Sequence, residues 1–242
     1  PLSSCETFDP RTEVFAPCAA MGRARSGHRA VLLGGGRVLV VGGTGPGSGD
    51  SGEIYDPEKD RWKLVKNSMS TYRQEPTATL LGDKVLIAGG AVSRQAELFF
   101  PDRNLFWPGK NKDETARLLG FVPPLPKPMI SPRQGAWALE IGHGRVLIGN
   151  GTGGGSQLKT TELFDAAANS FASAERTIGG GDGRAWALLS DGRFALTGGR
   201  DSTLVSTVVE AYRPATKRSA AVWQALEPLP HARMHHQLVE AR

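Results

Sequence analysis

The stretch from Gly27 to Gly43 reads GHRAVLLGGGRVLVVGG, with two short apolar runs on either side of Gly34–Gly36. Runs of this length, rich in valine and leucine, predict β-strands, and glycines between them supply the positive φ of a tight hairpin turn. A glycine-rich loop after a strand is also typical of phosphate sites. Recurrence of the whole pattern decides between these interpretations.

The hairpin pattern recurs three times, each time with a glycine or Asp-Gly turn between the strands and a glycine pair at the end. The copies are TATLLGDKVLIAGG (77–90), AWALEIGHGRVLIGNG (136–151) and AWALLSDGRFALTGG (185–199). The short apolar runs, 31 glycines and 16 prolines favour an all-β chain with many reversals.

A second pattern follows each glycine pair: a glutamate, any residue, then an aromatic, with a further aromatic later. The four glutamates are Glu53, Glu97, Glu162 and Glu210, and the aromatic pairs are Tyr55 with Trp62, Phe99 with Trp107, Phe164 with Phe171, and Tyr212 with Trp223. Glu6, Phe8 and Phe15 form a copy that has no hairpin before it. At the other end, Arg233–Val239 copies Arg25–Val31.

These motifs resemble the kelch repeat, with its Arg/His first strand, glycine doublet, Glu-x-aromatic and late tryptophan. The resemblance covers nearly the whole chain and implies a kelch-like β-propeller of four-stranded blades, each covering its neighbour. Four complete blades are expected, with a split or partial fifth, either as a ring closed imperfectly across the termini or as a piece of a longer propeller. We expect one domain over 1–242, with partial blades at 1–22 and 231–242 and full blades at about 23–66, 67–126, 127–175 and 176–230.

Two units depart from the pattern. Asn150 lies inside the third glycine pair, and Arg133 and Arg184 are about one place out of register with Arg25.

Gly149–Gly154 satisfies G-x-G-x-x-G, but no helical period follows to bind a pyrophosphate, so we interpret it as structural. His231 and His235 have the spacing of a helical zinc pair, yet Ala232 stands where a metalloprotease needs glutamate and the segment copies a strand. We therefore predict no metal site and no cofactor.

The resemblance also implies ligand-binding residues. By this resemblance the arginines that open the innermost strands should ring one mouth of the channel, where related domains clasp acidic peptide segments, and a guanidinium pairs a carboxylate bidentately. The alternative is a packing role, in which each guanidinium satisfies loop carbonyls. The predicted ligand-binding set is Arg25, His28, Arg73, Arg133, Arg184, Arg233 and His236.

We expect a non-catalytic binding or adhesion module for a protein segment or glycan, with acidic groups suited to the arginines. The alternative is a carbohydrate-active or sugar-isomerising propeller enzyme, for which Glu75 and Arg73 are the nearest acid/base candidates. Copper oxidation resembling galactose oxidase is not expected, because two of the three tyrosines, Tyr55 and Tyr212, are the blade aromatics. The insertion between Trp107 and Arg133 contains PPLPKP, expected as extended polyproline, and is either a binding loop or a tolerated surface loop.

Composition limits the partners. The net charge is +5, but the basic residues are spread along the chain without a run or a basic-aromatic stripe, so nucleic acid is not expected. No apolar segment is long enough to span a membrane. Cys5 and Cys18 either form a disulfide or remain two free thiols. The repeats resemble those of bacterial secreted kelch proteins, which implies an extracellular or cell-surface location, with the cytoplasm as the alternative.

Overall fold

The computed structural model describes residues 1–91, 93–120, 123–201, 203–215 and 219–236. The chain forms two compact units, Pro1–Ala91 with Gln95–Pro126, and Val92–Arg94 with Lys127–Arg242, called unit 1 and unit 2 below. A backbone hydrogen bond from Met129 N to Arg94 O (2.8 Å) attaches the short segment before Gln95 to unit 2.

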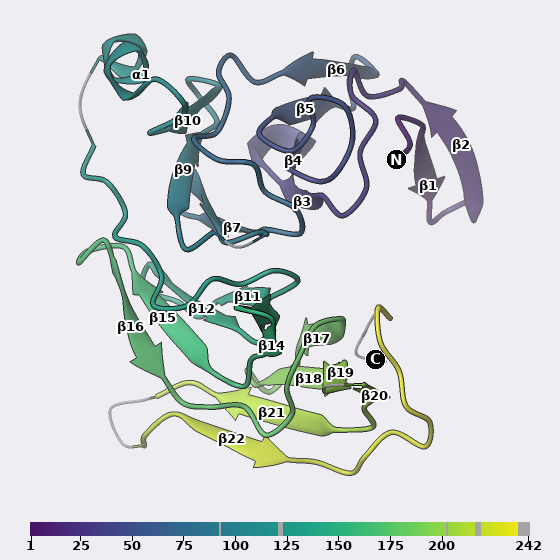
Figure 1. The fold of residues 1–242 in the computed structure, drawn as a ribbon. Coiled ribbons are helices and arrows are strands. Elements are labelled where there is room, and N and C mark those ends of the chain that lie inside the picture. Colours follow the sequence, from purple (N-terminus) through teal and green to yellow (C-terminus); the bar gives the residue numbers. More distant parts are fainter. Residues whose placement is uncertain (92, 121–122, 202, 216–218, 237–242) are drawn as a thin grey trace. The chain divides into compact units, whose positions relative to one another are not determined.

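Unit 1 contains two four-stranded antiparallel sheets in which neighbours in the chain pair in order. The first blade consists of β3 (Arg29–Leu32), β4 (Val38–Val41), β5 (Gly52–Asp56) and β6 (Arg61–Leu64). The second blade consists of β7 (Thr77–Leu81), β8 (Lys84–Ala88), β9 (Ala96–Phe100) and β10 (Leu105–Trp107). A separate hairpin, visible in Figure 1, is formed by β1 (Cys5–Asp9) and β2 (Val14–Cys18).

Unit 2 contains two more sheets of the same kind. The third blade consists of β11 (Trp137–Glu140), β12 (Arg145–Gly149), β15 (Thr161–Asp165) and β16 (Ser170–Ala174). The fourth consists of β17 (Arg184–Leu188), β18 (Phe194–Gly198), β21 (Val209–Arg213) and β22 (Val222–Ala225). In the third and fourth blades a short hairpin, with two residues in each strand, follows the second strand. These hairpins are β13 (Thr152–Gly153) with β14 (Ser156–Gln157), and β19 (Arg200–Asp201) with β20 (Leu204–Val205).

The all-β prediction of four four-stranded blades is confirmed over the described residues. Each hairpin follows the sequence pattern: the third unit, for example, pairs Trp137 with Gly149 across its first two strands. Gly149–Gly154 leads into the hairpin β13–β14, which agrees with its structural interpretation. The predicted C-terminal first strand falls partly on residues 237–242, which lie outside the described residues.

The aromatic pairs lie across the third and fourth strands. Tyr55 faces Trp62 with ring centroids 5.0 Å apart, and Phe164 faces Phe171 at 4.9 Å. In the second blade the partner of Phe99 is Phe106 at 5.3 Å, while Trp107 pairs with Leu98. The ring partner of Phe99 is therefore the aromatic seven residues away, as in the first and third blades, and not the later tryptophan of the repeat pattern.

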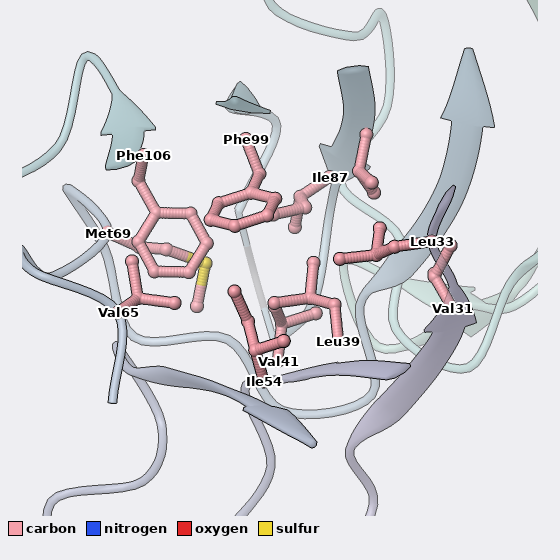
Figure 2. Close-up of a cluster of buried hydrophobic side chains, with 11 residues drawn as sticks. Val31, Leu33, Leu39, Val41, Ile54, Val65, Met69, Ile87, Phe99 and Phe106 are labelled. Atoms are coloured by element: carbon pink, nitrogen blue, oxygen red, sulfur yellow. The ribbon is translucent and has the colours of Figure 1, made fainter. Parts of the chain in front are cut away.

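Apolar side chains on facing strands form a core in each unit. Figure 2 shows the cluster in unit 1, in which side chains from both blades meet; it comprises Val31, Leu33, Leu39, Val41, Ile54, Val65, Met69, Val85, Ile87, Phe99 and Phe106. Unit 2 has its own cluster of Trp137, Leu139, Leu147, Phe194, Leu196 and Tyr212. Burial of these side chains supplies most of the free energy that holds the sheets together.

The insertion after β10 contains a helix that the sequence analysis missed. Helix α1 (Lys112–Leu119) begins at Asn111, whose side chain accepts a hydrogen bond from Glu114 N (3.1 Å), and ends at Gly120 in the left-handed conformation. Asn67 Nδ2 lies 3.1 Å from the Thr115 hydroxyl and fixes the helix to unit 1. Pro123–Pro128 forms no helix or strand.

Candidate functional site at the lead-in arginines

The segment just before the first strand of each blade, called the lead-in segment, carries the predicted arginines. Arg25, Arg73 and Arg133 each lie four residues before the first residue of their strand. The predicted register shift of Arg133 is therefore wrong. Comparison of the repeats in the sequence gives a shifted register because the third unit has a longer first turn and a different residue, Asn150, in its glycine pair.

Each of these arginines forms a buried ion pair with the glutamate of the Glu-x-aromatic pattern. That glutamate is the second residue of the third strand in every blade. The distances from Nη2 to Oε1 are 2.9 Å for Arg25–Glu53, 2.8 Å for Arg73–Glu97 and 3.0 Å for Arg133–Glu162. Arg184 pairs with Glu210 through Nη1. The side chains of all four pairs are at most 2% exposed.

The glutamates also hold the lead-in backbone. Glu53 accepts hydrogen bonds from Gly22 N (2.6 Å) and Arg23 N (3.1 Å). The other three carboxylates accept two backbone N–H groups each, from Ser70 and Gly109, from Ile130 and Ser131, and from Ile178 and Gly179. Because a charged acceptor strengthens these bonds, each carboxylate fixes the path of the chain into its blade.

The guanidiniums further bind carbonyls of the loop that follows the second strand. Arg25 Nη1 donates to Gly42 O (2.7 Å), and Arg73 Nη1 donates to Gly89 O (2.6 Å) and Gln95 O (3.0 Å). Arg133 Nη1 donates to Asn150 O and Thr160 O, both at 2.9 Å. These contacts are those of the packing alternative. Contact of the same guanidiniums with a ligand stays a prediction.

The fourth blade builds its ion pair differently. Gly151 N donates to Gly181 O (2.9 Å), as Gly43 N donates to Arg73 O (2.9 Å), so Gly181 occupies the arginine position. A Cβ at residue 181 would lie 1.4 Å from Arg200 O, which excludes a side chain. Arg184, the first residue of β17, reaches Glu210 from another direction, which agrees with its predicted departure from register. Burial lowers the pKa of Arg184, and Glu210 opposes this.

Arg233 and the two histidines differ from the buried arginines. The guanidinium of Arg233 is exposed and has no acceptor among the described residues, while its carbonyl accepts Gly199 N (2.8 Å). His236 Nε2 lies 2.7 Å from the Thr197 hydroxyl. His28 is half-buried, and burial lowers its pKa, with Arg25 and Arg29 acting in the same direction. Burial and Arg233 likewise lower the pKa of His236.

Asn150 is a buried residue whose role the sequence analysis did not find. Its side chain donates to Leu158 O (2.9 Å), Thr177 Oγ1 (2.8 Å) and Gly179 O (3.0 Å). Its Oδ1 accepts the indole N–H of Trp137. Asparagine tolerates the left-handed φ of 58° at this position, so it replaces the usual glycine and ties the third blade to the lead-in segment of the fourth.

The two acid/base candidates of the enzymatic alternative, Arg73 and Glu75, have different surroundings. Arg73 is fully buried and bound to Glu97, whereas Glu75 lies where its charge acts on Arg29. The four glutamates were visible in the sequence as a repeated pattern, but they were assigned no role. Their recurrence at one position of a predicted buried strand is the signal that each needs a cationic partner.

Comparison with known proteins agrees with this architecture. Residues 24–69 match the Kelch motif. Kelch-like protein 7 of Rattus norvegicus and of Mus musculus is 38% identical over 65 residues, which is 26% of this chain and 11% of each relative. A fungal alcohol oxidase solved in complex with copper superimposes with a TM-score of 0.71 and 17% identity, over 96% of this chain and 49% of its own length.

A structural likeness at 17% sequence identity shows the fold alone. Copper belongs to the oxidase structure; in the described part of this chain, no group of three or more His, Cys, Asp or Glu side chains is placed to hold a metal. Tyr55 donates its hydroxyl to Asp60 (2.8 Å) and Tyr212 is buried, so neither offers a free phenol. The four-stranded blades and the structural match along the chain show a fold of the β-propeller kind, in which residues 24–69 match the Kelch motif.

Proposed function

We propose that this protein is a non-catalytic binding module that recognises a segment of another protein through the loops next to the lead-in segments. The observation that carries the proposal is the buried Arg–Glu pair in each blade, which fixes the lead-in segment and the loop after the second strand in one frame. A rigid scaffold that presents variable loops is the usual arrangement of binding proteins. The Kelch match supports a protein partner.

The loops after the second strands differ from blade to blade. In the first blade this loop is rich in glycine, and in the third and fourth it contains the hairpins β13–β14 and β19–β20. Leu204 and Val205 in β20 are 74% and 39% exposed, so this hairpin offers an apolar contact. In this proposal the loops of each unit contact the partner, together with His28 in unit 1 and with Arg233 and His236 in unit 2, while the buried arginines hold the frame within their own blades.

We also propose that the protein works outside the cytoplasm. Cys5 and Cys18 form a disulfide between β1 and β2 with a Cα–Cα distance of 5.2 Å, and they are register partners in the hairpin. Disulfides persist in oxidising compartments, which supports an extracellular or cell-surface location. Among the described residues no helix has the length and apolar character needed to cross a membrane.

The test is binding to a panel of labelled peptides and glycans, followed by fluorescence anisotropy. We expect saturable binding to peptides, weakened by Leu204→Asp with Val205→Asp and unchanged by Leu188→Asp, because Leu188 is a comparably exposed leucine in a blade strand. Absence of peptide binding, together with turnover of an alcohol or sugar substrate, would contradict the proposal in favour of an enzyme.

A further inference from the structure

We propose that a cavity in unit 1 binds carboxylate side chains of an acidic segment of the partner. The cavity has a volume of about 290 Å³ and is lined by residues of the first and second blades. Its basic residues are Arg37, Arg61, Lys63, Lys66 and Arg103, and this site is called the basic cavity. It lies along β5 and β6 of the first blade and beside the β9–β10 turn of the second blade.

The strand pattern places these cations together. Arg61 and Lys63 alternate along β6, so their side chains leave the sheet on the same face. Across the pair of strands, Arg61 lies opposite Asp56 and Lys63 lies opposite Ile54, and all four line the cavity. Arg103 approaches from the turn between β9 and β10 of the neighbouring blade.

Hydrogen bonds between the first and second blades hold the backbone next to the basic cavity. Lys66 N donates to Asn104 O (3.2 Å), and Asn104 Nδ2 donates to Leu64 O (3.3 Å). Asn104 itself is 8% exposed. The cations are therefore carried on backbone that is already held in place, which lowers the entropy cost of arranging them around a ligand.

The charge of the basic cavity is not neutralised from within. Asp56 and Asp102 are its acidic lining residues, and Asp56 already pairs with Lys59 (2.9 Å), which is not part of the lining. Over the described residues, none of the five cations of the cavity takes part in an ion pair, in contrast to the lead-in arginines of the blades. Clustered like charges in a concave site attract an anionic ligand.

Size and lining select the ligand. A volume of 290 Å³ is at the lower limit for small-molecule sites, so the cavity takes one or two side chains rather than a folded surface. Ile54 and Pro101 offer apolar contact to the methylene groups of a glutamate, and the arginines pair with its carboxylate. This inference rests on the proposed function, because it gives the chemistry of the partner segment and a second place where it is held.

The experiment measures binding of a labelled peptide of alternating Glu and Ser to the whole chain. The comparison probes are the same peptide with Gln for Glu, and a sulfated oligosaccharide. The double variant Arg61→Gln with Arg103→Gln removes two exposed cations of the basic cavity. Arg176→Gln with Arg213→Gln is the matched control, because both arginines are exposed in unit 2 and neither is in an ion pair among the described residues.

We expect the cavity variant to lose about tenfold in affinity for the Glu peptide, with the control unchanged and binding weakened by salt. Equal loss in both variants, or in neither, overturns the cavity but leaves the proposed function standing. If uncharged peptides bind and the Glu peptide does not, the cavity proposal is also overturned and the proposed function still stands. Binding of the sulfated sugar alone overturns the peptide assignment, and failure of every peptide overturns both proposals.

Discussion

Arg73 and Glu97 show how one ion pair can hold a blade. Both side chains are fully buried, and Glu97 also accepts the N–H groups of Ser70 and Gly109. Two charges removed from water are stable only when their hydrogen bonds are nearly complete, and deletion of one partner leaves the other buried and unpaired.

We therefore expect Arg73→Met to lower the free energy of unfolding by about 3 kcal/mol or more. Urea unfolding followed by tryptophan fluorescence measures this. Arg11→Met serves as the control, since the side chains of Arg11 and its partner Asp9 are 88% and 39% exposed and the pair contributes little. Equal stability of wild type and Arg73→Met would show that the pair does not hold the blade.

His28 makes stability depend on pH. Burial, with the charges of Arg25 and Arg29, holds its pKa below the ordinary value of 6.5. On acidification the unfolded chain therefore takes up a proton first, so the free energy of unfolding is complete above pH 6.5 and falls as the pH drops below that value towards the folded pKa.

The substitution His28→Gln should remove this part of the pH dependence. We expect the difference in unfolding free energy between about pH 7.5 and about pH 5.5 to be smaller in the variant than in wild type. His143→Gln, at an exposed turn residue, is the control for the loss of one imidazole. A steeper profile in His28→Gln would contradict the lowered pKa.

At the scale of elements, the hairpin β1–β2 has less support than any strand of the four blades. It is a two-stranded sheet, and its aromatic pair, Phe8 and Phe15, is 50% and 65% exposed, whereas Phe99 and Phe106 of the second blade are fully buried. Two strands without a covering layer are marginal in water, so the disulfide between Cys5 and Cys18 is the main constraint on the hairpin.

Replacing both cysteines by serine should therefore loosen this hairpin alone. A loop of this length gains about 3 kcal/mol from cross-linking in the chain-entropy model. Hydrogen exchange followed by mass spectrometry is expected to show lost protection over Cys5–Cys18 in the variant and unchanged protection in β7–β9. Unchanged exchange in the hairpin would show that other contacts hold it.

At the scale of the whole molecule, the sequence predicts one propeller domain over 1–242, and two substitutions can test this. Arg73→Met acts in unit 1, and Asn150→Gly acts in unit 2 by removing the buried amide and its contacts with Leu158, Thr177 and Gly179. If the chain is one cooperative domain, calorimetry of either variant shows a single transition at a lower temperature. Two transitions, each moved by only one of the substitutions, would contradict a single domain.

The sequence by itself determined the strands of the four blades and their turns, but not helix α1 or the short hairpins β13–β14 and β19–β20. Each blade is a meander in which chain neighbours pair, so Asp83 and Gly82, or Asp191 and Gly192, specify a hairpin without help from distant residues. The glutamates were visible for the same reason, as a repeat at constant spacing.

Only the tertiary structure decided what these residues contact. Arg25 meets Glu53 across the loop after the second strand, and Phe99 meets Phe106 rather than Trp107, because strand register sets the partner. In the fourth blade Gly181 occupies the arginine position, where a side chain has no room, and Arg184 forms the ion pair instead. Arg61 and Arg103 line one cavity although they lie in different blades. Sequence spacing records local pairing, whereas burial and the grouping of charges arise when blades pack side by side.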